Sequence, residues 1–393
     1  MKLEDTEAEA ALRQEIRPWL ASRLNETWWD QYRSLEGAEW LALMKQWQFD
    51  QWRAGIAARS WPKQFGGQGA GISEDLIIFE ELARADAPND IFRVGTRIIA
   101  PMMMVLARDE QKRRFLPSIA NGSELWSQGF SEPEAGSDVA ALRTRVVRKG
   151  TKFILKGQKT WNSFGHLADY CLVLARSNPD LPKHKGLTAF AVPLNAPGIR
   201  VAPIRQMNNQ HVFNEIFFDD VEVGEEDIIG KPDGGWEVAV TMLDFERRGI
   251  SAVGFGCRRL FERLLDLARS TRIQGSGATA IDNPIIRSRL LELGVQARIG
   301  VLNNHRFAAM IPSGGVPGAE ASLQKLHATE LNKAMHAVAL ELAAMADLSA
   351  PQSQHRFAAW QCDYLTSFAG TIAGGTSQIQ RNIIGERLLG LPR

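Results

Sequence analysis

The first residues that suggest chemistry lie in one short polar stretch, Gly129–Ala141, between two apolar segments. It carries two hydroxyls, Ser131 and Ser137, and Gly136 leaves backbone amides accessible. Because it holds no group of metal-ligating side chains, the stretch suits an uncharged or anionic planar ligand. A purely local role also fits, since Ser131 and Glu134 have capping-box spacing and Ser137-Asp138 can cap another helix. Both interpretations stay open on these residues alone.

Other familiar sites find little support in the sequence. Cys171, Cys257 and Cys362 lie far apart, without a C-x-x-C pair or companion histidines. This pattern disfavours a zinc site and a disulfide framework, and it fits a reducing compartment. The glycines of Ser60–Gly69 are not followed by G-K-[ST], so this segment is predicted to be a structural loop. No metal site is expected.

The composition bounds the class of protein. The chain has 393 residues and a formal net charge of +1, enough length for two or three domains and no charge excess for nucleic acid or an anionic membrane. No apolar run reaches the ~18–20 residues of a membrane-spanning helix. The acidic start Met1–Asp5 lacks a hydrophobic signal region. We therefore expect a soluble, cytoplasmic protein.

The sequence divides into three regions that differ in the spacing of their apolar residues, and the polar stretch lies in the second of them. Residues 1–122 are expected to form a helical domain, and residues 123–232 a β-domain. The helices are predicted after Asp5 or Thr6, near 38–49, from Ser73, over 92–106, and from Asp109 until Pro117 halts the helix. The strands are predicted at 142–147, 152–156, 170–175, 188–192 and 214–223.

Helical periodicity returns in residues 233–393. Asp233 is predicted to cap a long helix whose apolar stripe includes Val240 and Leu243 and continues to Leu264. Further helices are predicted over 285–310, 320–347, 354–369 and 377–388. The order helical, β, helical shows no strand–helix alternation and no G-x-G-x-x-G motif, so a Rossmann sheet is disfavoured.

This order resembles the acyl-CoA dehydrogenase family over nearly the whole chain. The matching motifs are Asp109–Pro117, Gly129–Ala141, Lys159–Ser163 and Gly375–Arg381. The resemblance implies an α+β fold with an N-terminal helical domain (1–122), a middle β-barrel or sandwich domain (123–232) and a C-terminal four-helix bundle (233–393). It also implies FAD as the cofactor. Phe130 replaces the aliphatic residue of the strictest signature, at a position where only a backbone contact is expected.

The residues expected to bind FAD come from this resemblance. Phe130 and Ser131 are expected along the edge of the flavin ring with Gln128 beside them, and Gly136 and Ser137 along the route of the pyrophosphate and the acyl-CoA. The other expected cofactor residues are Trp161, Asn162, Ser163, Thr376 and Gln378. An aromatic ring would cover the flavin face while hydroxyls and amides polarise its nitrogens. Without the family match, Trp161 would be interpreted as a core residue.

The base that removes the α-proton is not at the position common in the family. Many members carry a glutamate immediately before the Gly-Thr-Ser segment, where this chain has Gly374. Taken alone, this departure suggests an inactive enzyme. Isovaleryl- and long-chain-type members instead carry the base on the first long C-terminal helix, in a Leu-Asp-Leu-Glu-Arg-like segment. Leu243–Arg247 resembles that segment, which makes Glu246 the expected base.

Helical spacing places Glu246 at the border of the predicted apolar stripe, where a raised pKa is expected. The competing interpretation is an ordinary helix glutamate paired with Arg247 or Arg248. The resemblance places Asp244 and Arg247 near the substrate thioester or pantetheine, as it does Ser137. The Gly374 amide would donate to the thioester carbonyl, because that role needs no side chain.

Two family motifs that reach the FAD of a neighbouring subunit are absent. Residues 268–277 lack Arg-x-x-Phe-Gly, and residues 339–348 lack Gln-x-x-Gly-Gly-x-Gly. Some bacterial members form α2β2 heterotetramers of two related chains. We expect either the base-bearing chain of such a heterotetramer or a divergent homotetramer.

The resemblance thus predicts an FAD-dependent acyl-CoA dehydrogenase that makes a trans-2-enoyl-CoA and passes electrons to an electron-transferring flavoprotein or a similar acceptor. A flavin oxidase or monooxygenase of the same fold and a non-catalytic subunit of a heteromeric enzyme are the alternatives. The acyl group stays open among fatty, branched, dicarboxylic and steroid side-chain thioesters.

Overall fold

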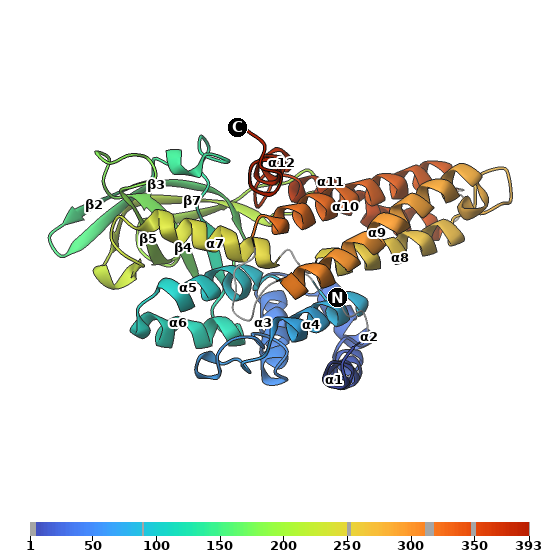
Figure 1. The fold of residues 1–393 in the computed structure, drawn as a ribbon, viewed down its shortest axis with the longest axis horizontal. Helices are drawn as coiled ribbons and strands as arrows, with labels where there is room; N and C mark the ends of the chain where they lie inside the picture. Colours follow the sequence, from blue (N-terminus) through green and yellow to red (C-terminus); the bar gives the residue numbers. More distant parts are fainter. Residues whose placement is uncertain (1–4, 89, 250–252, 311–317, 347–350, 393) are drawn as a thin grey trace. The chain divides into compact units, whose positions relative to one another are not determined.

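A computed structural model describes residues 5–88, 90–249, 253–310, 318–346 and 351–392. They fall into two compact units, which we describe separately. The sheet unit comprises Arg23–Asp75 and Pro88–Glu246, and the bundle unit comprises Met1–Ser22, Leu76–Ala87 and Arg247–Arg393. Figure 1 gives the element labels used below.

The sheet unit is built on one eight-stranded sheet of order β6-β7-β3-β2-β4-β5-β8, with β1 paired to β4. Its strands are β1 (Trp126–Gly129), β2 (Arg145–Lys149), β3 (Lys152–Ser163), β4 (Tyr170–Arg176), β5 (Leu187–Pro193), β6 (Ile199–Pro203), β7 (Phe213–Val223) and β8 (Ile228–Ile229). Neighbouring strands pair antiparallel, except that β4 runs parallel to β1 and β2. The five predicted strands are present, but the one predicted at 142–147 begins at Arg145 and the one predicted at 152–156 continues to Ser163; β1, β6 and β8 were not predicted.

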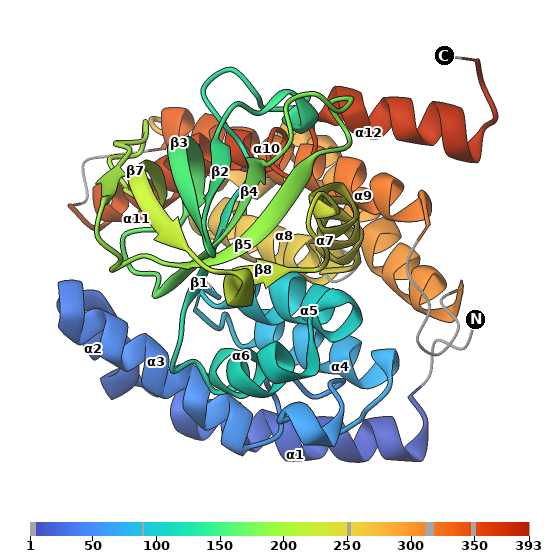
Figure 2. The ribbon, with the colours of Figure 1, turned by 90° about the vertical axis from the view of Figure 1, so that its left-hand side faces the viewer.

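The sheet unit also contains several helices, and part of them covers one face of the sheet (Figure 2). They are α2 (Glu26–Ser34), α3 (Gly37–Arg53), a π-helical turn η2 (Gly95–Ile99), α5 (Ala100–Leu106), α6 (Asp109–Asn121) and α7 (Gly235–Gly249), with 3-10 turns η1 (Lys63–Phe65), η3 (Val139–Ala141) and η4 (Glu225–Asp227). Ser60–Gly69 forms a tight loop around η1, as predicted. The prediction that Pro117 halts a helix was wrong, because α6 continues past it to Asn121.

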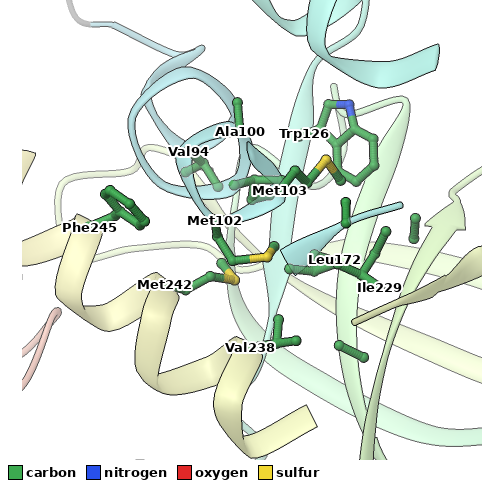
Figure 3. Packing of buried hydrophobic residues seen from close by; sticks show 14 of the residues in the cluster. Val94, Ala100, Met102, Met103, Trp126, Leu172, Ile229, Val238, Met242 and Phe245 are labelled. Atoms are coloured by element: carbon green, nitrogen blue, oxygen red, sulfur yellow. The ribbon is translucent and has the colours of Figure 1, made fainter. Parts of the chain in front are cut away.

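One core of the sheet unit lies between the sheet and the helices α5, α6 and α7, and a second is formed among the strands themselves, around Leu155, Phe190 and Phe218. Figure 3 shows Met102 of α5 and Met242 of α7 pointing toward one another, with Leu172 of β4 beside them. The buried face of α7 runs through Val238, Met242 and Phe245. The predicted stripe through Val240 was therefore wrong, since Val240 is 39% exposed.

Asp233 does not cap α7. It has a left-handed backbone with φ of 59°. Its amide donates to the Thr188 hydroxyl at 2.9 Å, and its carboxylate accepts from Ser177. Gly234 and Gly235 follow, and the helix begins at Gly235. The single long helix predicted from here is described as α7 and α8, and residues 250–252 lie outside the described residues.

The bundle unit is helical. It contains α1 (Glu7–Arg23), the greater part of α4 (Ile72–Arg84), α8 (Val253–Ser270), α9 (Pro284–Met310), α10 (Glu320–Met345), α11 (Pro351–Gly370), α12 (Ser377–Ile383) and a π-helical turn η7 (Ile384–Leu388), with a 3-10 turn η6 (Ala280–Asp282). The long helices α8, α9, α10 and α11 lie side by side and share one apolar core (Figure 1). Thr6 and Glu9 form the capping box of α1. No helix among the described residues is long and apolar enough to cross a membrane.

Candidate functional site

The polar stretch Gly129–Ala141 is pinned to strand β3 by its backbone. The Thr160 amide donates to the Ser131 carbonyl at 2.9 Å, and Lys159 Nζ donates to the Phe130 carbonyl at 3.2 Å. Phe130 itself is buried at 5% exposure. Both carbonyls therefore face β3, which fixes the course of the chain where it leaves β1.

A buried carboxylate completes this anchor. Glu132 Oε1 accepts from Lys159 Nζ at 2.8 Å and from the Thr144 amide at 2.8 Å, and Oε2 accepts from the Arg143 amide at 2.6 Å. Burial works to raise the pKa of Glu132, but Lys159 and these hydrogen bonds hold that pKa below its usual value. Burial lowers the pKa of Lys159, and the Glu132 charge opposes that shift. Three donors around one carboxylate favour a pair in which both groups are charged.

The local capping interpretation was wrong. Instead of a helix, Glu132 and Ala135 close a tight turn with reciprocal backbone hydrogen bonds of 3.0 and 3.1 Å. Glu134 is exposed and pairs with Arg143 at 2.7 Å. The Asp138 side chain makes no cap at η3 and pairs with Lys183 at 2.8 Å.

The remaining polar groups of the stretch are accessible. The Ser131 amide and hydroxyl make no hydrogen bond within the described part of the chain. Gly136 and Ser137 are exposed, and a Cβ at Gly136 would meet no atom within 4 Å. The stretch thus offers donors on a surface with open space beside it.

Strand β3 carries a bulge that turns Trp161 outward. Lys159 pairs with Ile216 and Asn162 pairs with Asn214, so β3 advances by three residues where β7 advances by two. Trp161 takes a left-handed φ of 61° and is 59% exposed. Its ring makes an edge contact with Phe213 at 6.0 Å between centroids. The core interpretation of Trp161 was therefore wrong.

Next to Trp161, a polar network ties the end of β3 to β1. Asn162 is fully buried, and its Nδ2 donates to the Gln128 carbonyl at 2.6 Å. The Asn162 carbonyl accepts from Asn214 Nδ2 at 2.9 Å, and His166 Nδ1 lies 3.1 Å from Asn214 Oδ1. Burial lowers the pKa of His166, which favours the neutral ring with Nδ1–H donating to Asn214. The Ser163 carbonyl accepts from Ser127 Oγ at 2.9 Å.

One polar atom of this network, Asn162 Oδ1, lacks a hydrogen-bond donor: it is buried and has no hydrogen-bond partner in the sheet unit. A buried acceptor without a donor is costly, on the order of 1–3 kcal/mol. It therefore marks a place where a bound donor would be stabilised.

Glu246 lies on α7 at the edge of that helix's buried face. It is half-buried, directly follows the buried Phe245 and stands one turn after the buried Met242. This is the border position that the sequence predicted, although the buried face itself is a different one. Asp244 is also half-buried. The side chains of Arg247 and Arg248 lie outside the described residues, so their proposed contacts are not described.

In the bundle unit, Gly374–Thr376 forms the turn between α11 and α12. Gly374 and Gly375 have φ of 65° and 90°, which favour glycine at both positions. Gln380 Nε2 donates to their carbonyls at 2.9 and 3.1 Å, and the buried Lys325 donates to the Gly375 carbonyl at 2.8 Å. Thr376 caps α12 by accepting from the Ile379 amide at 3.2 Å. Gln378, one residue into the helix, is exposed.

The residues that the structure brings together in the sheet unit fit a flavin. Ser131 offers an amide and a hydroxyl, Trp161 offers an exposed ring, and Asn162 offers an unpaired acceptor, which match a flat heterocycle that carries both acceptors and an N–H donor. No group of three or more histidine, cysteine or carboxylate side chains in the described ranges could hold a metal ion.

Sequence reasoning missed the side chains that hold these segments in place. None of Glu132, Lys325 and Gln380 was predicted to have such a role. The role of Glu132 could have been inferred from Lys159. Lys159 follows Leu155 and Gly157 at two-residue spacing on β3, which places it on the buried face. A lysine on a buried face requires a partner.

Comparison with known proteins places all three regions in one family. Residues 6–123, 127–221 and 233–389 match the N-terminal, middle and C-terminal domain models of acyl-CoA dehydrogenase. The chain is 35% identical to the acyl-CoA dehydrogenase IpdE1 of Mycobacterium tuberculosis over 391 residues, which is 97% of each chain.

Solved structures agree with this assignment. The ChsE4–ChsE5 complex of Mycobacterium tuberculosis contains a chain that is 32% identical, with a TM-score of 0.84 over 100% of both chains. The Tcur3481–Tcur3483 steroid ACAD contains a chain that is 27% identical, also with a TM-score of 0.84 over 100% of both chains. The expected α+β architecture is confirmed by these matches. This chain belongs to the acyl-CoA dehydrogenase family and is an FAD-dependent oxidoreductase.

Proposed function

We propose that this enzyme converts a CoA thioester with a bulky, steroid-derived acyl group into the trans-2-enoyl-CoA, with Glu246 as the base. The support for the acyl group is the likeness to the steroid ACAD pair at 27% identity over the full length. The observation that carries the base is the position of Glu246, a carboxylate at the buried edge of α7. The position common in the family is Gly374, which has no side chain to act as a base.

In the proposed reaction, the Glu246 carboxylate takes the proton from Cα. The Gly374 amide holds the thioester carbonyl as negative charge develops on its oxygen. Asp244 and Arg247 orient the CoA part of the substrate together with Ser137. The chemistry that FAD would supply when bound is acceptance of the hydride that leaves Cβ. The residues proposed to hold FAD are those assigned from the motifs: Gln128, Phe130, Ser131, Gly136, Ser137, Trp161, Asn162, Ser163, Thr376 and Gln378.

The base assignment is tested with Glu246→Gln. Anaerobic bleaching of the flavin by acyl-CoA is expected to slow by about 10²–10⁴-fold, while bound FAD is retained. Glu237→Gln is the matched control, because Glu237 is an exposed carboxylate on the same helix. Bleaching at the wild-type rate in Glu246→Gln would remove Glu246 as the base.

The acyl group is tested by competition between substrates. CoA thioesters of steroid carboxylic acids are expected to give a higher kcat/KM than straight-chain acyl-CoAs of similar carbon number. A preference for straight chains would refute the steroid assignment and leave the base assignment untouched. Oxidation of the reduced flavin by air, compared with an electron-transferring flavoprotein, separates a dehydrogenase from an oxidase.

We also propose that this chain works with a paralogous chain in an α2β2 assembly. Two features support this: the absent motifs at 268–277 and 339–348, and the likeness to a chain of the ChsE4–ChsE5 complex. The chain purified alone is expected to hold less than one FAD per chain and to gain FAD when co-expressed with its paralogue. Stoichiometric FAD and full turnover in the isolated chain would refute the heteromer and favour a homotetramer. No turnover in the assembly would favour a non-catalytic role.

A further inference from the structure

A buried ion pair lies directly beneath the Phe130–Ser131 peptide. The Lys159 side chain has 0% exposure and Glu132 has 8%, and the pair is 2.8 Å apart. A buried ion pair often contributes no more stability than apolar residues of the same shape. The hydrogen bond from Lys159 to the Phe130 carbonyl indicates a role besides stability.

The pair controls the direction of one peptide group. In a trans peptide the C=O and N–H point in opposite directions. Because Lys159 Nζ holds the Phe130 carbonyl toward β3, the Ser131 N–H is turned away from the sheet. The next carbonyl, of Ser131, is held by Thr160, and the amide of Glu132 is used within the turn by Ala135. The Ser131 amide is therefore the donor left facing outward, beside its own hydroxyl.

The carboxylate is what holds the lysine in this position. Glu132 joins Lys159 on β3 to the amides of Arg143 and Thr144, which precede β2. Three donors from two segments of chain converge on its two oxygens, so neither the carboxylate nor the ammonium can move without breaking several bonds. An apolar side chain at Lys159 would leave the Phe130 carbonyl without its donor.

We propose that Glu132 and Lys159 are positioning residues for FAD: they fix the Phe130–Ser131 peptide so that the Ser131 amide and hydroxyl face an acceptor edge of the flavin. The pair acts through Ser131 and does not itself touch the cofactor. The inference rests on the assignment of Gly129–Ala141 to the flavin made under Proposed function.

The double variant Lys159→Met/Glu132→Gln tests this, because it removes both buried charges and nearly keeps the side-chain volumes. The matched control is Lys152→Met/Glu222→Gln, an ion pair of 2.9 Å that also joins β3 to another segment but is 59% and 61% exposed. FAD is titrated into the apoprotein of the full chain, in its complex with the partner chain if FAD binding requires one, and the melting temperature of the apoprotein is recorded.

The FAD dissociation constant of the buried-pair variant is expected to rise about 10–100-fold, the loss of one or two aligned hydrogen bonds. Its apoprotein is expected to melt within a few degrees of the control. Unchanged FAD affinity in the folded variant would overturn the proposal. So would an equal loss in the exposed-pair control.

A measurement on the wild type keeps the test independent of how the variant folds. Hydrogen exchange at the Ser131 amide is expected to be fast in the apoprotein and at least tenfold slower with FAD bound. Equal protection in both states would overturn the proposal. Neither readout requires turnover, so failure to oxidise any acyl-CoA would count against the proposed function and not against this positioning role.

Discussion

Substituting Gly375 by alanine would test how tightly the turn before α12 is held. A Cβ at Gly375 would lie 2.6 Å from Gln380 Nε2, the atom that donates to the carbonyls of Gly374 and Gly375. Alanine at φ of 90° costs about 1–2 kcal/mol in backbone strain. Displacing Gln380 adds about 1 kcal/mol for each of the two hydrogen bonds. The total destabilisation is therefore about 3–4 kcal/mol.

Gly275→Ala is the matched control. Gly275 lies in the same unit with φ of 74°, and a Cβ there would meet no atom within 4 Å. Gly275→Ala should lower the free energy of unfolding only by the backbone strain. The melting temperature of Gly375→Ala is therefore expected to be about 4–8 °C below that of Gly275→Ala. The assay is thermal unfolding, repeated in a Gln380→Ala background, where the clash is absent and Gly375→Ala should cost strain alone. Equal melting temperatures for the two glycine variants, or an unchanged cost in the Gln380→Ala background, would refute the reasoning.

Two further predictions concern charge and strain. Three arginines hydrogen-bond the fully buried Glu81, and although burial opposes it they lower its pKa from 4.5 to about 2. The charged Glu81 carboxylate thus adds about 3 kcal/mol to the free energy of unfolding above pH 4.5, and this contribution is lost as the pH falls toward 2. The difference in unfolding free energy between wild type and Glu81→Gln should shrink over that range, and a constant difference would contradict the assignment. At Trp161, glycine should give a protein more stable than alanine by about 1 kcal/mol, the reverse of the usual order in a strand, because φ is 61°. Chemical denaturation decides this, and alanine being the more stable would show that the bulge relaxes.

Most helices and strands could be predicted because they follow from periodicity. Most helices of residues 1–122, the longer strands of the sheet and the helices of the bundle have the expected spacing, whereas α2 (Glu26–Ser34) was not predicted. Pro117 was misjudged because local propensity was given priority over packing. Phe115, Leu116, Ile119 and Ala120 are buried on both sides of it, and their burial outweighs the ~3 kcal/mol that a proline inside a helix costs.

The errors at the site have a different physical cause. The stripe on α7 was placed from apolar positions alone, yet which of two apolar faces is buried depends on the partners supplied by α5 and the sheet. Without the family resemblance, Trp161 would have been interpreted as a core residue from its size, because a strict two-residue alternation does not reveal a β-bulge. The role of Glu132 depends on Lys159, 27 residues away, and such pairings arise only when the sheet has formed.

The bulge in β3 also bears on how sequences of this family can diverge. Residues two apart in a regular strand point to the same side. Lys159 and Trp161 point to opposite sides only because the bulge inserts one extra residue in β3 at this point. A deletion between them would turn either the lysine out of the interior or the tryptophan into it, and an insertion would shift Asn162 away from Gln128. The interval between the lysine and the tryptophan should therefore resist insertions and deletions even where the residues around it change freely. A related chain in which that interval differs would mark a lineage that has lost this arrangement of Lys159 and Trp161.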